Sequence, residues 1–396
     1  MKFIKVLMIL CVLSLSISGC VKDMTQKENK GKNQALQNQE QKVYAESKEI
    51  AECYHDIYTK GYQNQNLNSV EVKQEIIDCI GKKGIAVTDT ENQINMVNPE
   101  QVENFCEAAK NAQKAETTIF LVMDNGGFIR YDLKTKNGSI DVVRSSLYWE
   151  ENQAKADYFE EFKAYTWMYT EKGYLFIEQY HMEGYDGAPG QTAIRVKPLD
   201  QICRELNQKY VRPVGYERNK LFITDWNECN YDNLDFYDLY EIMYHIKYGT
   251  DVPYDSDYGG TEYEIPKDKF EEVLKTYFQI DSNILEEKAF YHPESQTYLY
   301  RPRGMYDTEF PYAPYPEVVA YEKQEDKTIK LTIEAVWTRK KLERAITSEL
   351  VVRPLENGAF QYVSNRVVPT QDGIEPIWYN ARLTDEEWKA YYGNKE

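Results

Sequence analysis

The chain has 396 residues and a net charge of −18 at pH 7, because 65 Asp and Glu residues outnumber 47 Lys and Arg residues. A chain this acidic repels phosphate backbones, which argues against nucleic-acid binding as its main activity. A chain of this length is usually too long to fold around a single hydrophobic core, which favours two domains.

The first 20 residues have the layout of a secretory signal that ends in a cysteine. Two lysines precede an apolar run over residues 6–17, which is too short to cross the hydrocarbon core of a membrane as a helix. The stretch ISGC at residues 17–20 resembles the lipobox of bacterial lipoproteins, in which the cysteine carries diacylglycerol and cleavage occurs ahead of it. The resemblance implies a signal peptide over residues 1–19, lipid on Cys20 and an extracytoplasmic location at the cell membrane. The alternative is an ordinary secretory signal with an incidental cysteine.

The next segment, residues 20–45, is rich in Gln, Asn and Lys, which predicts a flexible tether between the lipid and the folded body. Residues 1–48 contain eight Lys and four acidic residues, so the body from residue 49 onward carries a net charge of −22. The slightly basic tether suits the anionic membrane surface beneath it.

Five cysteines remain once Cys20 and the cysteine inside the signal are set aside. They are Cys53, Cys79, Cys106, Cys203 and Cys229. An odd number rules out a disulfide framework that uses all of them, and no C-x-x-C pair points to a redox motif or a structural zinc site. We interpret them as buried thiols that act as small apolar residues, and one or two disulfides are the alternative.

The first half of the body predicts helices followed by strands. Helical periodicity covers residues 46–58, 69–80 and 99–114. From residue 117 the pattern changes to strands, beginning with a hairpin over residues 117–133 that turns at residues 124–127. Further strands are expected over residues 139–149, 162–170, 174–182 and 192–199. These elements predict a domain over residues 46–199 with helices packed on an antiparallel β-meander.

The second half repeats this order and predicts another domain over residues 200–396. Helices are expected over residues 199–210, 233–249 and 265–278. Strands are expected over residues 220–226 and 327–337 and in a hairpin over residues 344–365. The expected class is therefore α+β, with two units that each place helices on an antiparallel meander, as cystatin-like or NTF2-like folds do. An internal duplication would explain why TAIRVKPL and SELVVRPL each stand near the end of a meander.

Several stretches of the second half resemble an uncharacterised family of lipoproteins from Gram-positive anaerobes. The stretches are VRPVGYERNKLFITDW, NLDFYDLYEIMYHIKYG, EIPKDKFEEVL, YRPRGMYDTEFPYAPYPEVVAYEKQEDKTIKLTIEAVW, SELVVRPLENGAFQYVSN and RLTDEEW. They cover most of residues 190–390. The family has no assigned reaction, ligand or catalytic residue, so the resemblance implies a location and one functional residue, the lipid-bearing Cys20.

No familiar catalytic motif occurs in the chain. It lacks G-x-S-x-G, G-x-x-x-x-G-K-[ST], H-E-x-x-H and G-x-G-x-x-G, the usual signatures of elbow-type serine hydrolases, P-loop enzymes, zincins and dinucleotide-binding enzymes. Among the histidines, only His245 has a carboxylate four residues away on an expected helix, that of Glu241, and two ligands do not make a zinc site. We expect no catalytic residue, no metal site and no cofactor, and we favour a non-enzymatic role.

Tyrosine is abundant, with 34 residues in the chain. A tyrosine presents a rigid apolar face and a polar tip, which suits sugar rings, peptide strands and protein surfaces. In residues 298–317 four prolines accompany aromatic and basic side chains. We favour a loop clamped onto its own sheet, and the alternative is an exposed recognition surface. The candidate ligand-binding residues of that surface are Tyr300, Arg301, Arg303, Tyr306, Phe310, Tyr312 and Tyr315.

Together these patterns favour a lipid-anchored extracytoplasmic protein with a binding or structural role at the cell envelope. Its expected partners are the membrane, through the lipid on Cys20, and a cell-wall glycan, peptide or envelope protein, with no nucleic acid. Two alternatives stay open, an envelope hydrolase that uses acidic residues and an accessory subunit of a surface complex. A deep pocket with two carboxylates of divergent pKa would favour the hydrolase, and a shallow aromatic groove would favour binding.

Overall fold

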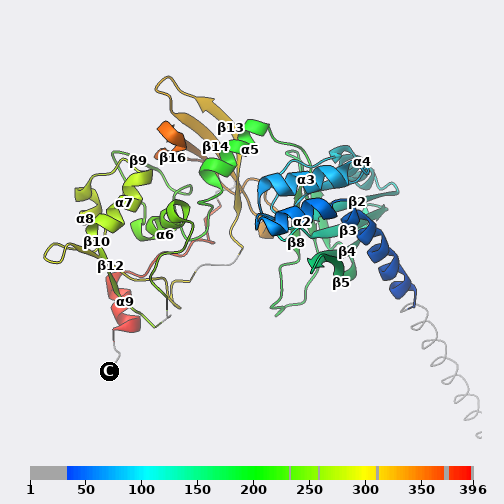
Figure 1. The fold of residues 1–396 in the computed structure, drawn as a ribbon, viewed down its shortest axis with the longest axis horizontal. Helices are drawn as coiled ribbons and strands as arrows, with labels where there is room; N and C mark the ends of the chain where they lie inside the picture. Colours follow the sequence, from blue (N-terminus) through cyan, green and yellow to red (C-terminus); the bar gives the residue numbers. More distant parts are fainter. Residues whose placement is uncertain (1–33, 232, 257–258, 309–311, 370–373, 394–396) are drawn as a thin grey trace, which may run out of the picture. The chain divides into compact units, whose positions relative to one another are not determined.

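The structure, a computed structural model, describes residues 34–231, 233–256, 259–308, 312–369 and 374–393 (Figure 1). The chain divides into two compact units, Met1–Ala164 and Tyr165–Glu396. Both units combine helices with mostly antiparallel sheets, which confirms the predicted α+β class. None of the described helices is long and apolar enough to span a membrane. The predicted signal over residues 1–19 and the lipid-bearing Cys20 lie outside the described residues.

The border between the units falls earlier than the sequence predicts. The predicted domains are 46–199 and 200–396, whereas the second unit begins at Tyr165 and includes a small antiparallel sheet. The sheet consists of β6 (Thr166–Tyr169), β7 (Tyr174–Glu178) and β8 (Gln191–Arg195). Arg195 on β8 donates from Nη1 to the carboxylate of Glu317 at 2.6 Å, and both side chains are buried. This buried ion pair joins the small sheet to the second unit.

The first unit opens with a helix over residues 34–52. The sequence predicts a flexible tether over residues 20–45, but residues 34–45 are helical in the structure. The difference has a packing cause, because Val43 is buried and its carbonyl accepts a hydrogen bond from Arg130 Nη1 at 3.3 Å. Glu46 pairs with the same guanidinium at 2.8 Å. These tertiary contacts stabilise a helix in a stretch whose polar composition alone predicts none.

The sheet of the first unit has the strand order β1-β2-β3-β4-β5. The strands are β1 (Ala86–Asp89), β2 (Ala115–Val122), β3 (Phe128–Lys136), β4 (Ser139–Glu150) and β5 (Gln153–Lys163). Strands β2 to β5 pair antiparallel, which confirms the hairpin between β2 and β3 and the strand that follows it. Strand β5 is not among the predicted strands, since the next one was expected over residues 162–170. Strand β1 is not among the predicted strands and pairs parallel to β2, because a helical crossover connects the two.

Three further helices belong to the first unit, α2 (His55–Gln63), α3 (Val70–Gly81) and α4 (Pro99–Lys110). Helix α4 forms the crossover from β1 to β2, and α3 and α4 contact these two strands (Figure 1). Ile76 and Ile80 of α3 pack with Phe120 and Phe128 of the sheet in a buried core. The predicted arrangement of helices on a meander is therefore present in this unit.

The second unit contains two more sheets, with strand orders β13-β14-β15-β16-β9 and β10-β12-β11. The strands are β9 (Trp226–Asn227), β10 (Tyr263–Pro266), β11 (Tyr291–His292), β12 (Thr297–Tyr300), β13 (Tyr315–Lys323), β14 (Ile329–Val336), β15 (Thr347–Pro354) and β16 (Phe360–Val368). The helices are α5 (Gln201–Leu206), α6 (Phe236–Tyr248), α7 (Lys267–Tyr277), α8 (Ser282–Lys288) and α9 (Asp385–Tyr392). Three short segments are also helical, the π-helix η1 (Asn207–Val211) and the 3₁₀ helices η2 (Thr338–Lys340) and η3 (Glu356–Gly358). The predicted hairpin over residues 344–365 is confirmed by the pairing of β15 with β16.

Helix α6 carries the central side chains of the candidate site, and the sequence accounts for both of its ends. The carboxylate of Asp235 accepts hydrogen bonds from the backbone N–H groups of Tyr237 and Asp238 at 2.9 and 3.0 Å. Gly249 ends the helix with φ at +70°, a conformation that glycine adopts without strain. Phe236, Leu239, Tyr240 and Met243 form the stripe of this helix that enters the core, and Asp238 is buried beside that stripe.

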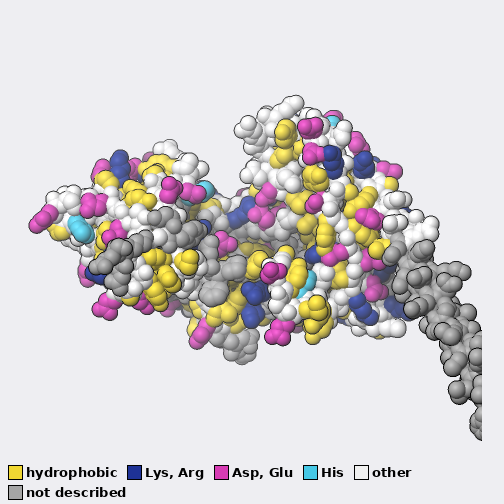
Figure 2. All heavy atoms as spheres, turned by 90° about the horizontal axis from the view of Figure 1, so that it is seen from below, with side chains coloured by type: hydrophobic (Ala, Val, Ile, Leu, Met, Phe, Trp, Pro, Cys, Tyr) yellow, Lys and Arg dark blue, Asp and Glu magenta, His cyan; other side chains and the backbone are white. Residues whose placement is uncertain are grey.

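Tyrosine rings fill much of the core of the second unit. Tyr240, Tyr298, Tyr300 and Tyr362 are all buried, and the first two contact the ring of Phe270. Buried tyrosines supply apolar area while their hydroxyl groups find hydrogen-bond partners, which explains part of the tyrosine content. Acidic side chains, in contrast, are scattered over the face seen in Figure 2.

Candidate functional site

A buried ion network joins α6 to two distant segments of the second unit. Its centre is Asp238, whose side chain is 1% exposed. Arg303 Nε and Nη2 donate to the two oxygens of this carboxylate at 3.0 and 2.7 Å, and Arg382 Nε donates at 2.6 Å. The hydroxyl of Tyr379 donates to the same carboxylate at 3.2 Å. One carboxylate therefore fixes the segment after β12 and the segment before α9.

The network continues from Arg382 to Glu241, which lies one turn further along α6. Glu241 forms an ion pair with Arg382 and accepts a hydrogen bond from the hydroxyl of Tyr300 at 2.7 Å. Arg382 Nη1 also donates to the backbone carbonyl of Arg301 at 2.7 Å. Arg382 Nε also lies 3.7 Å from a carboxylate oxygen of Asp235, so two guanidinium groups meet three carboxylates. Removing Asp238 would leave the buried Arg303 without the carboxylate that it binds.

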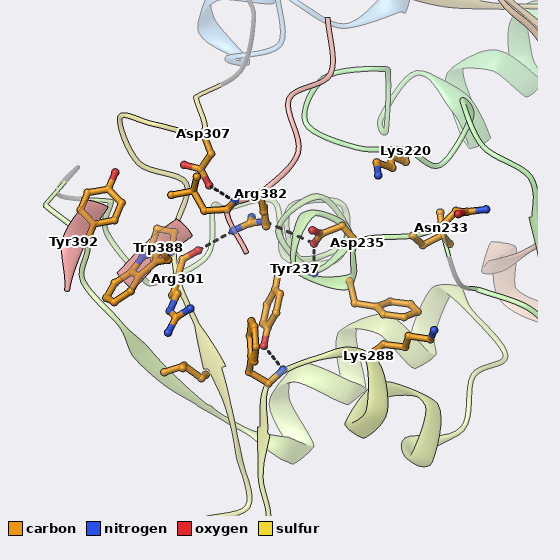
Figure 3. Close-up of a pocket in the computed structure, with 16 residues that line it drawn as sticks. Lys220, Asn233, Asp235, Tyr237, Lys288, Arg301, Asp307, Arg382, Trp388 and Tyr392 are labelled. Atoms are coloured by element: carbon orange, nitrogen blue, oxygen red, sulfur yellow. Dashed lines mark hydrogen bonds and ion pairs between the residues drawn. The ribbon is translucent and has the colours of Figure 1, made fainter. Parts of the chain in front are cut away.

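A pocket of about 300 Å³ opens beside Arg382 (Figure 3). Trp388 and Arg301 lie on one side of it. On the opposite side lie Lys220, Asn233 and Lys288. Asp235, Tyr237, Phe290, Asp307 and Tyr392 also line the pocket. Its volume is at the lower end of the range of small-molecule sites and fits a ligand of roughly one or two sugar rings.

The side chain of Arg301 lies between two aromatic rings at the pocket wall. Its guanidinium carbon is 4.1 Å from the ring centre of Trp388 and 5.4 Å from that of Phe290. Its Nη2 lies 2.7 Å from Glu262 and 2.9 Å from Asp385. Since Asp385 and Trp388 belong to α9, these contacts fasten the C-terminal helix to the end of β12.

Two donors in the pocket lining have no hydrogen-bond partner among the residues that the structure describes. They are Arg301 Nη1 and the hydroxyl of Tyr392, and both atoms are buried. Buried polar groups in native proteins almost always have a partner, which can be a protein group, a water molecule, an ion or a ligand. Both groups can donate, but each atom has almost no solvent-accessible area, so these donors lie behind the pocket surface and not on it.

The lining carries four basic and two acidic side chains. The basic residues are Lys220, Lys288, Arg301 and Arg382. Both acids serve the backbone, because Asp235 caps α6 and Asp307 accepts a hydrogen bond from the N–H of Gly304 at 2.7 Å. Burial, followed by the nearby charge of Asp238, raises the pKa of Asp235, and Arg382 opposes this shift. Basic side chains outnumber acidic ones in the lining, although Arg301 and Arg382 already pair with acids such as Asp385 and Asp238, and this majority favours an anionic ligand.

A second hollow, of about 610 Å³, is lined by other residues of the same network, including Glu241 and Arg303. Glu241 and His245 do not converge there on a common point, since Glu241 pairs with Arg382, and His245 Nδ1 lies 3.1 Å from Asp251. No group of three or more His, Cys, Asp or Glu side chains within the described ranges is placed to hold a metal ion. The smaller pocket is the stronger candidate because aromatic walls and four basic side chains meet in it.

A family model matches residues 40–382, which is most of the chain. The chain belongs to a family of unknown function, DUF6070. This confirms the predicted resemblance to an uncharacterised family, whereas the lipid anchor stays a prediction because the match begins after Cys20. No curated protein and no solved structure gives a significant match. The matched range includes Asp238 and Arg382, and helix α9 lies beyond its end.

Three of the seven predicted ligand-binding residues lie at or near the network. Tyr300 and Arg303 are buried, with exposed fractions of 1% and 9%, and bond to Glu241 and Asp238. Arg301 lines the pocket. Tyr300 and Arg303 therefore fit the favoured prediction, in which this segment is clamped onto its own sheet. Of the three residues, only Arg301 lines the pocket and could contact a ligand there.

The other four predicted residues lie outside the pocket lining or outside the described residues. Tyr306 is 51% exposed, and its ring stacks on Tyr391 with 4.1 Å between the ring centres. Tyr312 is 48% exposed. Tyr315 begins β13 and is half-buried, and Phe310 is not among the described residues.

The sequence patterns do not single out the residues that complete the pocket, such as Tyr237, Arg382 and Trp388. The family resemblance nevertheless pointed to these residues, because two of the stretches that carry it contain them. NLDFYDLYEIMYHIKYG includes Tyr237 and Asp238, and RLTDEEW includes Arg382 and Trp388. Nothing in either stretch indicates that they meet in space.

Proposed function

We propose that the chain is a lipid-anchored extracytoplasmic binding protein of a bacterial cell envelope, whose second unit captures an acidic cell-wall sugar in the pocket beside Arg382. The lipobox at residues 17–20 and the polar stretch that follows it support the anchor. The aromatic walls, the basic lining and the ion network behind them support the binding role.

The observation that carries the ligand class is the pocket lining, in which four basic side chains accompany two acidic ones. A carboxylate attached to a sugar ring would supply acceptors, and its charge would complement the basic lining. Phe290 at the pocket is 43% exposed and offers a ring face on which the apolar face of a sugar packs. The small volume suits one or two such rings better than an extended peptide.

Titration calorimetry with cell-wall disaccharides tests this proposal. We expect a disaccharide that carries a carboxylate to bind at least about tenfold more tightly than its neutral methyl ester, because one lost charge-assisted hydrogen bond costs about 1.5–3 kcal/mol. Trp388→Ala should weaken binding about 10- to 30-fold, since it removes the ring against which Arg301 is held. Tyr312→Ala is the matched control, because Tyr312 is an exposed aromatic residue outside the lining, and its binding should equal that of the wild type.

Equal binding of the acid and its ester would contradict the ligand class, and no binding by any fragment would contradict the function. Release of free reducing ends from the fragments would instead favour the envelope hydrolase, for which the raised pKa of Asp235 is the supporting feature.

The anchor has its own test in the Cys20→Ala variant. We expect this variant to lose the attached lipid and to leave the membrane fraction, because the thioether to diacylglycerol forms on this cysteine. Cys11→Ala is the control, since it removes a cysteine of the same signal that the lipobox does not use. Metabolic labelling with a fatty acid and membrane fractionation measure both effects. A Cys20→Ala protein that stays acylated and membrane-bound would rule out the anchor.

A further inference from the structure

Two cysteines of the first unit face each other. The sulfur of Cys79, on α3, lies 3.2 Å from the sulfur of Cys53. It also lies 2.9 Å from the backbone carbonyl of Cys53. Both residues are half-buried, whereas Cys106 is fully buried in the same unit. No other cysteine pair within the described ranges shows such a contact.

The fold holds this pair together through the packing of two helices. Cys53 lies in the turn between the helix over residues 34–52 and α2, where its N–H donates to the carbonyl of Ile50 at 3.1 Å. Helices α2 and α3 pack against each other. Gly61 allows this approach, because a β-carbon there would come within 2.8 Å of Leu67 and 3.1 Å of Val72. The cysteine contact is therefore a consequence of core packing.

We infer that Cys53 and Cys79 form a disulfide bond that fastens the joint between the first helix and α2 to helix α3. A disulfide sulfur separation is about 2.05 Å, so the two sulfurs, 3.2 Å apart, need to move closer by only about 1 Å. The inference does not depend on the proposed sugar pocket, which lies in the other unit. It replaces the interpretation of Cys53 and Cys79 as buried thiols. That interpretation is confirmed for the buried Cys106 and Cys203 and is wrong for Cys229, which is exposed.

The bond forms by thiol–disulfide exchange with an oxidant that is itself a disulfide, such as oxidised glutathione or a thiol oxidoreductase. The thiolate of one cysteine attacks the oxidant and releases one thiol, and the second cysteine then displaces the other thiol from the mixed disulfide. Two S–H bonds are lost and one S–S bond is gained, while the oxidant takes up two electrons and two protons. Burial and a hydrogen bond with Cys79 raise the pKa of Cys53 to about 12, so exchange at neutral pH is slow.

The position of the bond gives it a mechanical role. The helix over residues 34–52 is the first described element, and any pull on the N-terminal segment reaches the unit through it. A bond from Cys53 to Cys79 closes a loop that contains all of α2 and limits the unfolded states open to it. The expected consequence is a first unit that resists unfolding from its N-terminal end.

Peptide mapping of the full chain in detergent tests the inference. The protein is incubated with oxidised glutathione, the free thiols are blocked with N-ethylmaleimide, and the digest is analysed by mass spectrometry before and after reduction. We expect a linked peptide pair that contains Cys53 and Cys79, with Cys106 and Cys203 found as blocked thiols. The exposed Cys229 is the positive control, since its mixed disulfide with glutathione shows that the oxidant acted.

The inference is overturned if Cys53 and Cys79 are recovered separately, as blocked or glutathione-bearing thiols, while Cys229 is oxidised. A second measurement compares the Tm of oxidised and reduced protein, for which we expect the oxidised form to melt several degrees higher. Cys79→Ser keeps the size of the side chain and removes the bond, so its Tm should not respond to oxidation. An oxidised wild type with the link and an unchanged Tm would refute the mechanical role.

Discussion

The Asp238→Ala variant is expected to lose about 3–5 kcal/mol of its free energy of unfolding. The carboxylate is almost fully buried and accepts hydrogen bonds from both Arg303 and Arg382. Its removal leaves the buried guanidinium of Arg303 without the carboxylate that it binds through two nitrogens. The penalty is the cost of this uncompensated charge, which exceeds the net value of an intact pair.

Urea unfolding followed by tryptophan fluorescence measures this loss. Five of the six tryptophans lie in the second unit, so the signal reports mainly on the unit that contains Asp238. Glu349→Ala is the matched control, because Glu349 also pairs with an arginine, Arg366, but their side chains are 28% and 60% exposed. An exposed pair contributes less than about 1 kcal/mol. If both variants lost the same small amount, the network around Asp238 would not hold the segments that it joins.

The local elements of the fold were predictable because each rests on a short-range pattern. Helix α6 begins at an Asp that caps it and ends at Gly249, and both signals stand in the sequence. The hairpin of β15 and β16 follows from alternating apolar residues on either side of a Glu-Asn-Gly turn. The parallel strand β1 was missed because four residues that are buried on both faces show no alternation.

The candidate site was less predictable because its contacts are long-range. Arg382 and Asp238 are 144 residues apart in the chain, and no local pattern links them. The aromatic and basic residues of the segment 298–317 did predict a candidate binding surface, and one of them, Arg301, lines the pocket. Residues of α6 and α9 complete the pocket. Each of these segments has the sequence pattern of a common amphipathic helix, and nothing in either one alone indicates a binding site.

Tyr300→Ala is expected to lower the free energy of unfolding by about 3–5 kcal/mol, whereas Tyr312→Ala should change it by less than about 0.5 kcal/mol. Both tyrosines lie in the proline-rich segment over residues 298–317, but Tyr300 is 1% exposed and Tyr312 is 48% exposed. Truncation at the buried position removes packed aromatic area and leaves a cavity. The exposed ring makes no comparable contribution, and the hydrogen bond from Trp337 to the Tyr312 backbone carbonyl is kept in the alanine variant.

Tyr300→Phe separates the two parts of the larger effect, because it keeps the ring and removes the hydroxyl that donates to Glu241 at 2.7 Å. We expect this variant to lose about 1.5–3 kcal/mol, the usual value of a hydrogen bond to a charged group. The same urea titration measures all three variants. A stable Tyr300→Ala protein would show that the segment is not clamped to its sheet, and a strongly destabilised Tyr312→Ala protein would show that the clamp extends to the exposed rings. With the expected order of effects, the buried end of the segment holds Arg301 at the pocket, and the exposed tyrosines beyond it remain open to contact with a partner.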